Sequence, residues 1–146
     1  MLTIGYRSGS EKRRVAGRKE YVMLESSDLV AFVAATDLRR ARAFYEHTLG
    51  LRVLEQNDFA CVLDAHGTVL RVTAVPEVAR GGYTVLGWQV ADIVAVTREL
   101  TARGVTFLRY EAMSQDEHGV WTAPGGARVA WFADPDGNTL SLTQDA

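Results

Sequence analysis

Residues 127–142 read ARVAWFADPDGNTLSL, two strand-like runs on either side of a turn. The turn, Asp134 to Asn138, combines Pro and Gly with short polar side chains that bond to their own backbone, so the chain should reverse direction there. The flanking runs are rich in aromatic and β-branched residues, which favour strands. We therefore predict a β-hairpin whose connection lies on the surface.

Length and composition set the outer limits of the fold. The chain has 146 residues and is 47% hydrophobic, enough for one domain or for two small modules sharing one sheet. No apolar run approaches the ~20 residues needed to cross a membrane, and the N-terminus lacks the apolar core of a signal peptide. The single cysteine, Cys61, excludes an internal disulfide and sits in an apolar run. We expect a soluble cytoplasmic protein with Cys61 in its core and no membrane partner.

The positive charge is concentrated near the N-terminus. Residues 1–27 carry six Lys or Arg against three acids, whereas the rest of the chain carries ten against fifteen. This segment shows no clear periodicity, so we predict a flexible N-terminal extension, followed by a single domain over residues 28–146. Its few clustered cations are not interleaved with aromatic residues, and we expect no nucleic-acid partner.

The first half of the domain reads as strand, helix and three strands. Residues 29–35 are an apolar run of strand length, and Thr36-Asp37 is a good helix N-cap. Apolar residues then recur at helical spacing as far as Gly50, a typical C-terminal stop. The strand candidates that follow are residues 51–55, 60–63 and 69–75.

The second half repeats this organisation. A strand is expected over residues 83–90, and a helix capped by Asp92 ends at Gly104. The remaining strands are expected over residues 106–110, 127–133 and 139–143, with a long loop over 111–126. A repeat of about 55 residues predicts two modules, 28–80 and 81–146, that complete one another's core.

Four motifs occur in this order along the chain: Thr36-Asp-Leu-x-x-Ala-x-x-Phe-Tyr45, Leu49-Gly-Leu51, Val90-x-Asp-Ile93 and Phe132-x-Asp-Pro-Asp-Gly-Asn-x-Leu140. Residues 28–143 resemble the vicinal oxygen chelate superfamily, which includes glyoxalase I, extradiol dioxygenases, fosfomycin resistance proteins and bleomycin-binding resistance proteins. The resemblance implies an α+β fold of two βαβββ modules, each curling a four-stranded mixed sheet around a cavity, and often a homodimer.

In the enzymes of this superfamily the cavity holds a divalent metal. The resemblance places the metal ligands at Val30, Val85 and Ser141, with Arg71 at a position that supplies an acid in some members. Two valines cannot ligate, a neutral serine is a poor ligand, and a guanidinium would repel the ion. We therefore predict that the chain uses no metal and no other cofactor.

Other side chains are candidates for binding a small molecule. The resemblance turns Arg71 toward the cavity, where it could bind a carboxylate or phosphate; the alternative is an internal ion pair, for example with Glu55. Trp121 lies in a glycine-rich part of the long loop and suggests a lid. His118, in the same loop beside two acids, is either a ligand contact or simply solvated. The predicted ligand-binding residues are Val30, Phe59, Arg71, Val85, Trp88, Tyr110, His118, Trp121, Trp131 and Ser141.

Two function classes remain open. One is a metal-free binding protein, resembling the bleomycin resistance proteins, that sequesters an anionic or aromatic small molecule in the clefts of a homodimer. The other is an enzyme, a lyase, isomerase or dioxygenase type with a non-standard active site. The sequence favours the first, because the apolar positions and Arg71 suit ligand binding better than metal chemistry.

Overall fold

The computed structural model describes residues 22–146, so most of the predicted N-terminal extension, including its expected flexibility, lies outside the described residues. Residues 22–27 are exposed and contain one short 3-10 turn, η2 (Leu24–Ser26). Within residues 22–146, the helices are too short and too polar to cross a membrane.

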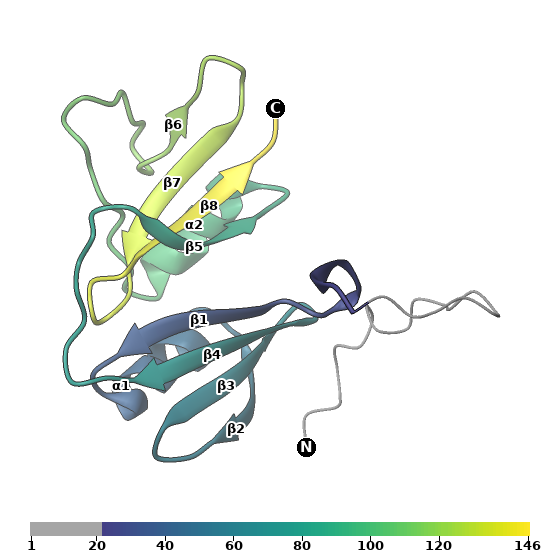
Figure 1. Ribbon diagram of the computed structural model, residues 1–146. Coiled ribbons are helices and arrows are strands. Elements are labelled where there is room, and N and C mark those ends of the chain that lie inside the picture. Colours follow the sequence, from purple (N-terminus) through teal and green to yellow (C-terminus); the bar gives the residue numbers. More distant parts are fainter. Residues whose placement is uncertain (1–21) are drawn as a thin grey trace, which may run out of the picture.

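The first module follows the predicted order. Its elements are β1 (Val30–Ala35), α1 (Leu38–Arg42), the π-helical turn η3 (Ala43–Thr48), β2 (Arg52–Gln56), β3 (Ala60–Ala65) and β4 (Thr68–Ala74) (Figure 1). Asp37 caps α1 by accepting hydrogen bonds from the backbone N–H groups of Arg39 and Arg40. Gly50, with φ of +82°, ends the helical segment. The sheet order is β1-β4-β3-β2, with β1 parallel to β4.

The second module has the same topology. Its elements are β5 (Thr84–Gln89), α2 (Ile93–Ala102), β6 (Trp121–Thr122), β7 (Arg128–Ala133) and β8 (Thr139–Gln144). Asp92 caps α2 through the N–H of Ala95, and β5 lies parallel to β8 in the order β5-β8-β7-β6. The predicted α+β fold of two βαβββ modules is therefore confirmed.

One predicted strand is wrong. Residues 106–110 form only an isolated bridge from Phe107 to Phe132, because side-chain bonds replace the strand ladder. Gln115 accepts from the N–H of Tyr110 and donates to the carbonyl oxygen of Leu108. The edge position beside β7 is taken by β6 instead, so Trp121, expected in a lid, lies in a short paired strand.

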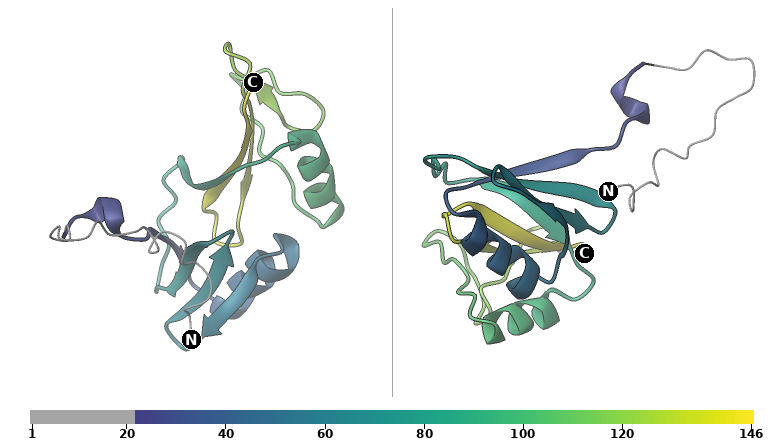
Figure 2. Two further views of the ribbon diagram at one scale, coloured as in Figure 1. Left: turned by 90° about the vertical axis from the view of Figure 1, so that its right-hand side faces the viewer. Right: turned by 90° about the horizontal axis from the view of Figure 1, so that it is seen from below.

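Both helices lie on one side of the two sheets (Figure 2). The larger of two apolar clusters lies between helices and sheets, joins the modules and includes Tyr45, Ile93 and Phe132; a smaller one, Ala60, Val62 and Val69, lies on the other face of the first sheet. Cys61 is fully buried in this core, as predicted. The opposite sheet face carries no helix of the described chain. We call it the open face, and every second strand residue points toward it.

Candidate ligand-binding face and module junction

The first sheet directs Arg71 to the open face. Leu70 and Val72, its neighbours in β4, are buried in the core, so Arg71 points the other way. In the parallel pairing of β1 with β4, Arg71 lies beside Phe32, and Val30 lies beside Val69. Phe32 is 62% exposed. This half of the open face therefore combines one cation with apolar side chains.

The second sheet directs Ser141 to the same side. Leu140 and Leu142 enter the core, and Ser141 between them faces Gly87 of β5 across the parallel pairing. A Cβ atom on Gly87 would lie 2.5 Å from the Ser141 Oγ, so a larger residue there would force the Ser141 hydroxyl to rotate away. Val85, two residues earlier in β5, is 44% exposed.

Three aromatic residues gather on the open face of the second sheet. Trp131 pairs with Ser141 in the β7–β8 ladder, and its ring centroid lies 5.4 Å from that of Tyr110 and 6.2 Å from that of Trp121. The first pair meets edge to face, a favourable aromatic geometry. A cavity of about 310 Å³ beside them is lined in part by Tyr83, Tyr110 and Trp131. Its size suits a small ligand.

Three of the ten predicted site residues lie elsewhere. Trp88 pairs with Leu142 on the helix side, where it lines an apolar cavity of about 230 Å³ between the modules. His118 lines a separate groove beside α2. Phe59 lies in the turn between β2 and β3 and is 77% exposed. The open face holds the other seven: Val30, Arg71, Val85, Tyr110, Trp121, Trp131 and Ser141.

The metal positions implied by the resemblance all lie on this face. They carry Val30, Arg71, Val85 and Ser141, which together offer one weak neutral oxygen donor and one fixed positive charge. Within residues 22–146, no three His, Cys, Asp or Glu side chains come together in a group that could hold a metal ion. The residues present therefore do not fit the divalent metal of the superfamily's enzymes.

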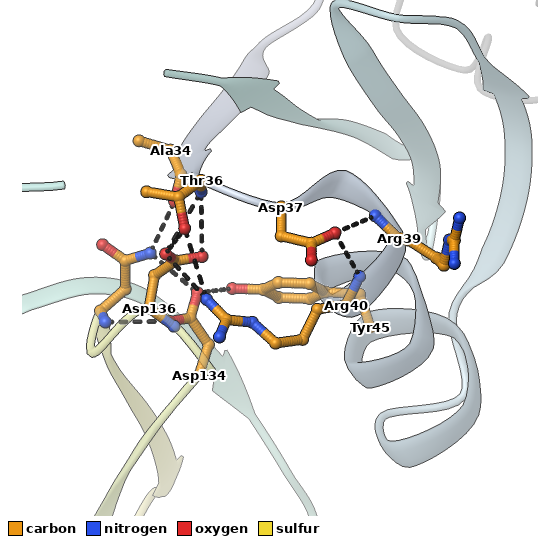
Figure 3. Close-up of polar contacts among 9 residues, drawn as sticks. Ala34, Thr36, Asp37, Arg39, Arg40, Tyr45, Asp134 and Asp136 are labelled. Carbon is orange, nitrogen blue, oxygen red and sulfur yellow. Dashed lines mark hydrogen bonds and ion pairs between the residues drawn. The ribbon is translucent and has the colours of Figure 1, made fainter. Parts of the chain in front are cut away.

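Sequence reasoning missed a buried polar network at the module junction (Figure 3). Asp134 lies at its centre: one carboxylate oxygen accepts from the Tyr45 hydroxyl at 2.7 Å, and the other accepts from the backbone N–H groups of Asp136 and Asn138 at 2.9 Å. Burial, and then the neighbouring Asp134 carboxylate, raise the pKa of Tyr45 far above its usual value. The Tyr45 phenol is thus a permanent donor.

The rest of this network ties the closing hairpin to the end of β1. Asp136 accepts from the backbone N–H and the hydroxyl of Thr36, the latter at 2.7 Å, and pairs with the guanidinium of Arg40 at 3.3 Å. The side-chain amide of Asn138 donates to the carbonyl oxygen of Ala34 at 2.9 Å. We call these residues the junction network: Ala34, Thr36, Arg40, Tyr45, Asp134, Asp136 and Asn138.

The junction network corrects one prediction. The turn between β7 and β8 was expected on the surface, yet Asp134, Asp136 and Asn138 are all buried. The first module supplies donors for both carboxylates, which removes most of the cost of burying them. The hairpin is thereby held at one position on the first module, and the open faces of the two sheets turn to the same side of the molecule.

Solved structures share this architecture. A putative glyoxalase family protein from Bacillus anthracis aligns with a TM-score of 0.65 at 17% identity, covering 88% of this chain and 100% of that one. A member of the glyoxalase/bleomycin resistance protein/dioxygenase superfamily from Sphaerobacter thermophilus gives 0.63 at 26% identity, covering 81% and 96%. A fosfomycin resistance protein from Listeria monocytogenes gives 0.64 at 14% identity, covering 81% and 92%. Among curated proteins, no sequence matches significantly.

These similarities define a protein built from paired βαβββ modules. The model of the Glyoxalase/Bleomycin resistance protein/Dioxygenase superfamily matches residues 28–142, and the chain belongs to this superfamily.

Proposed function

We propose that the protein binds an anionic small molecule with an aromatic or apolar body on its open face, without a metal, and sequesters it. One observation carries this proposal. The positions that would hold metal ligands carry two valines, a serine and an arginine, and they share the open face with the cluster of Tyr110, Trp121 and Trp131. The open face thus offers a surface for a ligand but no set of metal donors.

Arg71 supplies the charge that such a ligand needs. Within residues 22–146 its guanidinium makes no ion pair or hydrogen bond, and the alternative pairing with Glu55 is not formed. Its neighbours across the ladders are Phe32 and Val62. A guanidinium in apolar surroundings binds a carboxylate or phosphate more strongly than one in open water.

A hydroxyl near Arg71 supports the same assignment. Thr73, two residues further along β4, points to the same face, and its Oγ1 is buried without a hydrogen-bond partner in the described part of the chain. Buried hydroxyl groups are normally hydrogen-bonded. Because this Oγ1 is enclosed by protein atoms, it would donate to an oxyanion bound at Arg71 only after the side chains around it shift.

The open face also carries several large apolar side chains that are exposed to solvent. Phe32, Tyr83 and Val85 are all exposed. Large contiguous apolar patches on soluble proteins mark binding surfaces. We propose that a second copy of the chain covers part of this face and forms a homodimer, with a ligand cleft at the edge of the interface. Sedimentation equilibrium tests this part: dimer mass supports it, and monomer mass at high protein concentration contradicts it.

The binding proposal is tested by thermal-shift screening of aromatic carboxylates and aromatic phosphates. A ligand that binds the native state raises Tm. The rise should occur in the wild type and in Arg39→Gln, a matched variant at an exposed arginine of α1, and should be lost in Arg71→Gln. An equal rise in Arg71→Gln would remove Arg71 from the site. Chromatography of the incubated ligand checks for turnover, and any conversion would contradict sequestration in favour of the enzyme alternative.

A further inference from the structure

A second groove lies on the helix side of the molecule, away from the open face. It has a volume of about 540 Å³ and runs between the C-terminal half of α2 and the chain that follows it. This volume is within the range of small-molecule sites. Two buried apolar residues, Val105 and Phe107, form its floor.

The rim of this groove is basic. Arg98 and Thr101 lie three residues apart in α2 and therefore share one helix face. Arg109 and His118 contribute from the segment that follows, and Glu117 is the one acid among the residues that line the groove. We call this site the basic groove.

The loop that carries His118 is held in place by side-chain bonds. The guanidinium of Arg109 donates to the carbonyl oxygens of Gln115 at 3.4 Å and Glu117 at 3.1 Å, and Gln115 donates to Gly119 at 2.9 Å. Asp116 accepts from the backbone N–H of His118 at 2.8 Å. The groove is therefore largely formed before any ligand arrives, which lowers the entropic cost of binding.

Gly119 allows the loop to approach the floor closely. Its φ is +85°, and a Cβ atom there would lie 2.9 Å from the Cβ of Phe107. Glycine is the residue that tolerates both conditions. The loop therefore rests on Phe107, and His118 is fixed one residue away from that contact.

Donors for an anion remain available on the rim. Arg109 uses one N–H from each terminal nitrogen for the loop and keeps its other N–H groups. Arg98 is exposed and makes no ion pair or hydrogen bond within residues 22–146. His118 Nε2 lies 3.7 Å from a Glu117 carboxylate oxygen, and Thr101 and Thr106 add hydroxyl groups to the groove. Cations outnumber acids even when His118 is neutral.

We propose that the basic groove is a second binding site, for a small molecule that carries an oxyanion on an apolar body. The oxyanion would bind between Arg98 and Arg109, and the apolar part would lie on Val105 and Phe107. Guanidinium pairs match the geometry of phosphate and carboxylate oxygens. The site is independent of Arg71 and of the function proposed for the open face.

Titration of ¹⁵N-labelled full-length protein with inorganic phosphate, phenyl phosphate and benzoate tests this proposal. We expect saturable amide shifts in residues 105–109 and 117–119, with phenyl phosphate binding more tightly than phosphate because of the apolar floor. Comparing the affinities of phenyl phosphate and benzoate shows whether phosphate or carboxylate is preferred. Saturable binding of either compound in the basic groove supports the site. The absence of saturable shifts with all three probes would overturn it.

Variants separate this site from general attraction of anions. Arg98→Gln removes an exposed cation and should fold normally, yet it should weaken phenyl phosphate binding about tenfold or more, as expected for a charge-assisted hydrogen bond. Arg39→Gln, the same change at an exposed arginine outside the groove, should leave unchanged the affinity measured from the amide shifts of residues 105–109 and 117–119. Equal affinities in Arg98→Gln and Arg39→Gln would overturn the proposal.

Discussion

The hydroxyl of Tyr45 in the first module donates a hydrogen bond of 2.7 Å to the carboxylate of Asp134 in the second, across 89 positions of sequence. Both residues are buried. A carboxylate that leaves water needs all its acceptor sites satisfied, and Asp134 also accepts from the turn backbone and the Asn138 amide. This bond therefore connects the rigid turn of the closing hairpin to the helical segment of the other module.

Tyr45→Phe should destabilise the protein while leaving the packing of the ring unchanged. Removing one partner of a buried, charge-assisted hydrogen bond costs about 1–3 kcal/mol in the free energy of unfolding. Urea unfolding measures the loss. The matched control is Tyr83→Phe, at a residue that is 68% exposed, which should change the free energy by less than about 0.5 kcal/mol. Equal effects of the two substitutions would show that the bond to Asp134 contributes nothing.

The raised pKa of Tyr45 predicts a loss of stability in alkali. The unfolded chain releases this phenolic proton near pH 10, at about the pKa of a free tyrosine, whereas the folded chain retains it. The stabilising contribution is fully present below about pH 10 and is lost as the pH rises above it. Between about pH 8 and pH 11 the wild type should lose more unfolding free energy than Tyr45→Phe. If the unfolding free energies of the wild type and of Tyr45→Phe fell in parallel over this pH range, the raised pKa of Tyr45 would be refuted.

Cys61 should be unreactive in the native protein. Its side chain is fully buried, and burial raises the pKa of its thiol, so the reactive thiolate is scarce and inaccessible. Alkylation by iodoacetamide should be slow in buffer and fast in urea. Rapid labelling of the native protein would place Cys61 at an accessible position and contradict its role in the core.

The three tryptophans should report ligand binding unequally. Trp121 and Trp131 lie together on the open face, whereas Trp88 lies on the helix side. A ligand of the open face should change the fluorescence of the wild type and of Trp88→Phe, and most of the change should be lost in Trp131→Phe. If Trp88→Phe abolished the change instead, the ligand would lie in the cavity between the modules.

Local patterns in the sequence predict most of the fold. Asp37 and Asp92 cap their helices because a short carboxylate just before a helix accepts hydrogen bonds from the backbone N–H groups of its first turn. The repeated order of elements predicts the two modules, and alternation along β4 predicts the orientation of Arg71. These features depend on residues that are close together in the sequence, so the sequence alone is enough to predict them.

The errors arose where distant residues decide the structure. Residues 106–110 have strand-like composition, yet the side chain of Gln115 takes their backbone bonds. Asp134 and Asp136 look like solvated turn residues, since acids are seldom buried without partners, and their partners lie about a hundred positions away in the first module. The position of His118 also depends on a tertiary contact: the packing of Gly119 on Phe107 places its loop beside α2, and its role as a ligand contact or a solvated side chain stays a prediction.

The central claim, ligand binding on the open face without a metal, is tested most directly by elemental analysis. Protein purified without chelator should be incubated with excess Ni²⁺, Zn²⁺, Mn²⁺ or Fe²⁺, desalted and analysed by mass spectrometry. Because Val30, Val85, Ser141 and Arg71 provide no adequate donor set, we predict far less than one ion per chain for every metal. One tightly held ion per chain, lost on substitution of a residue of the open face, would contradict it.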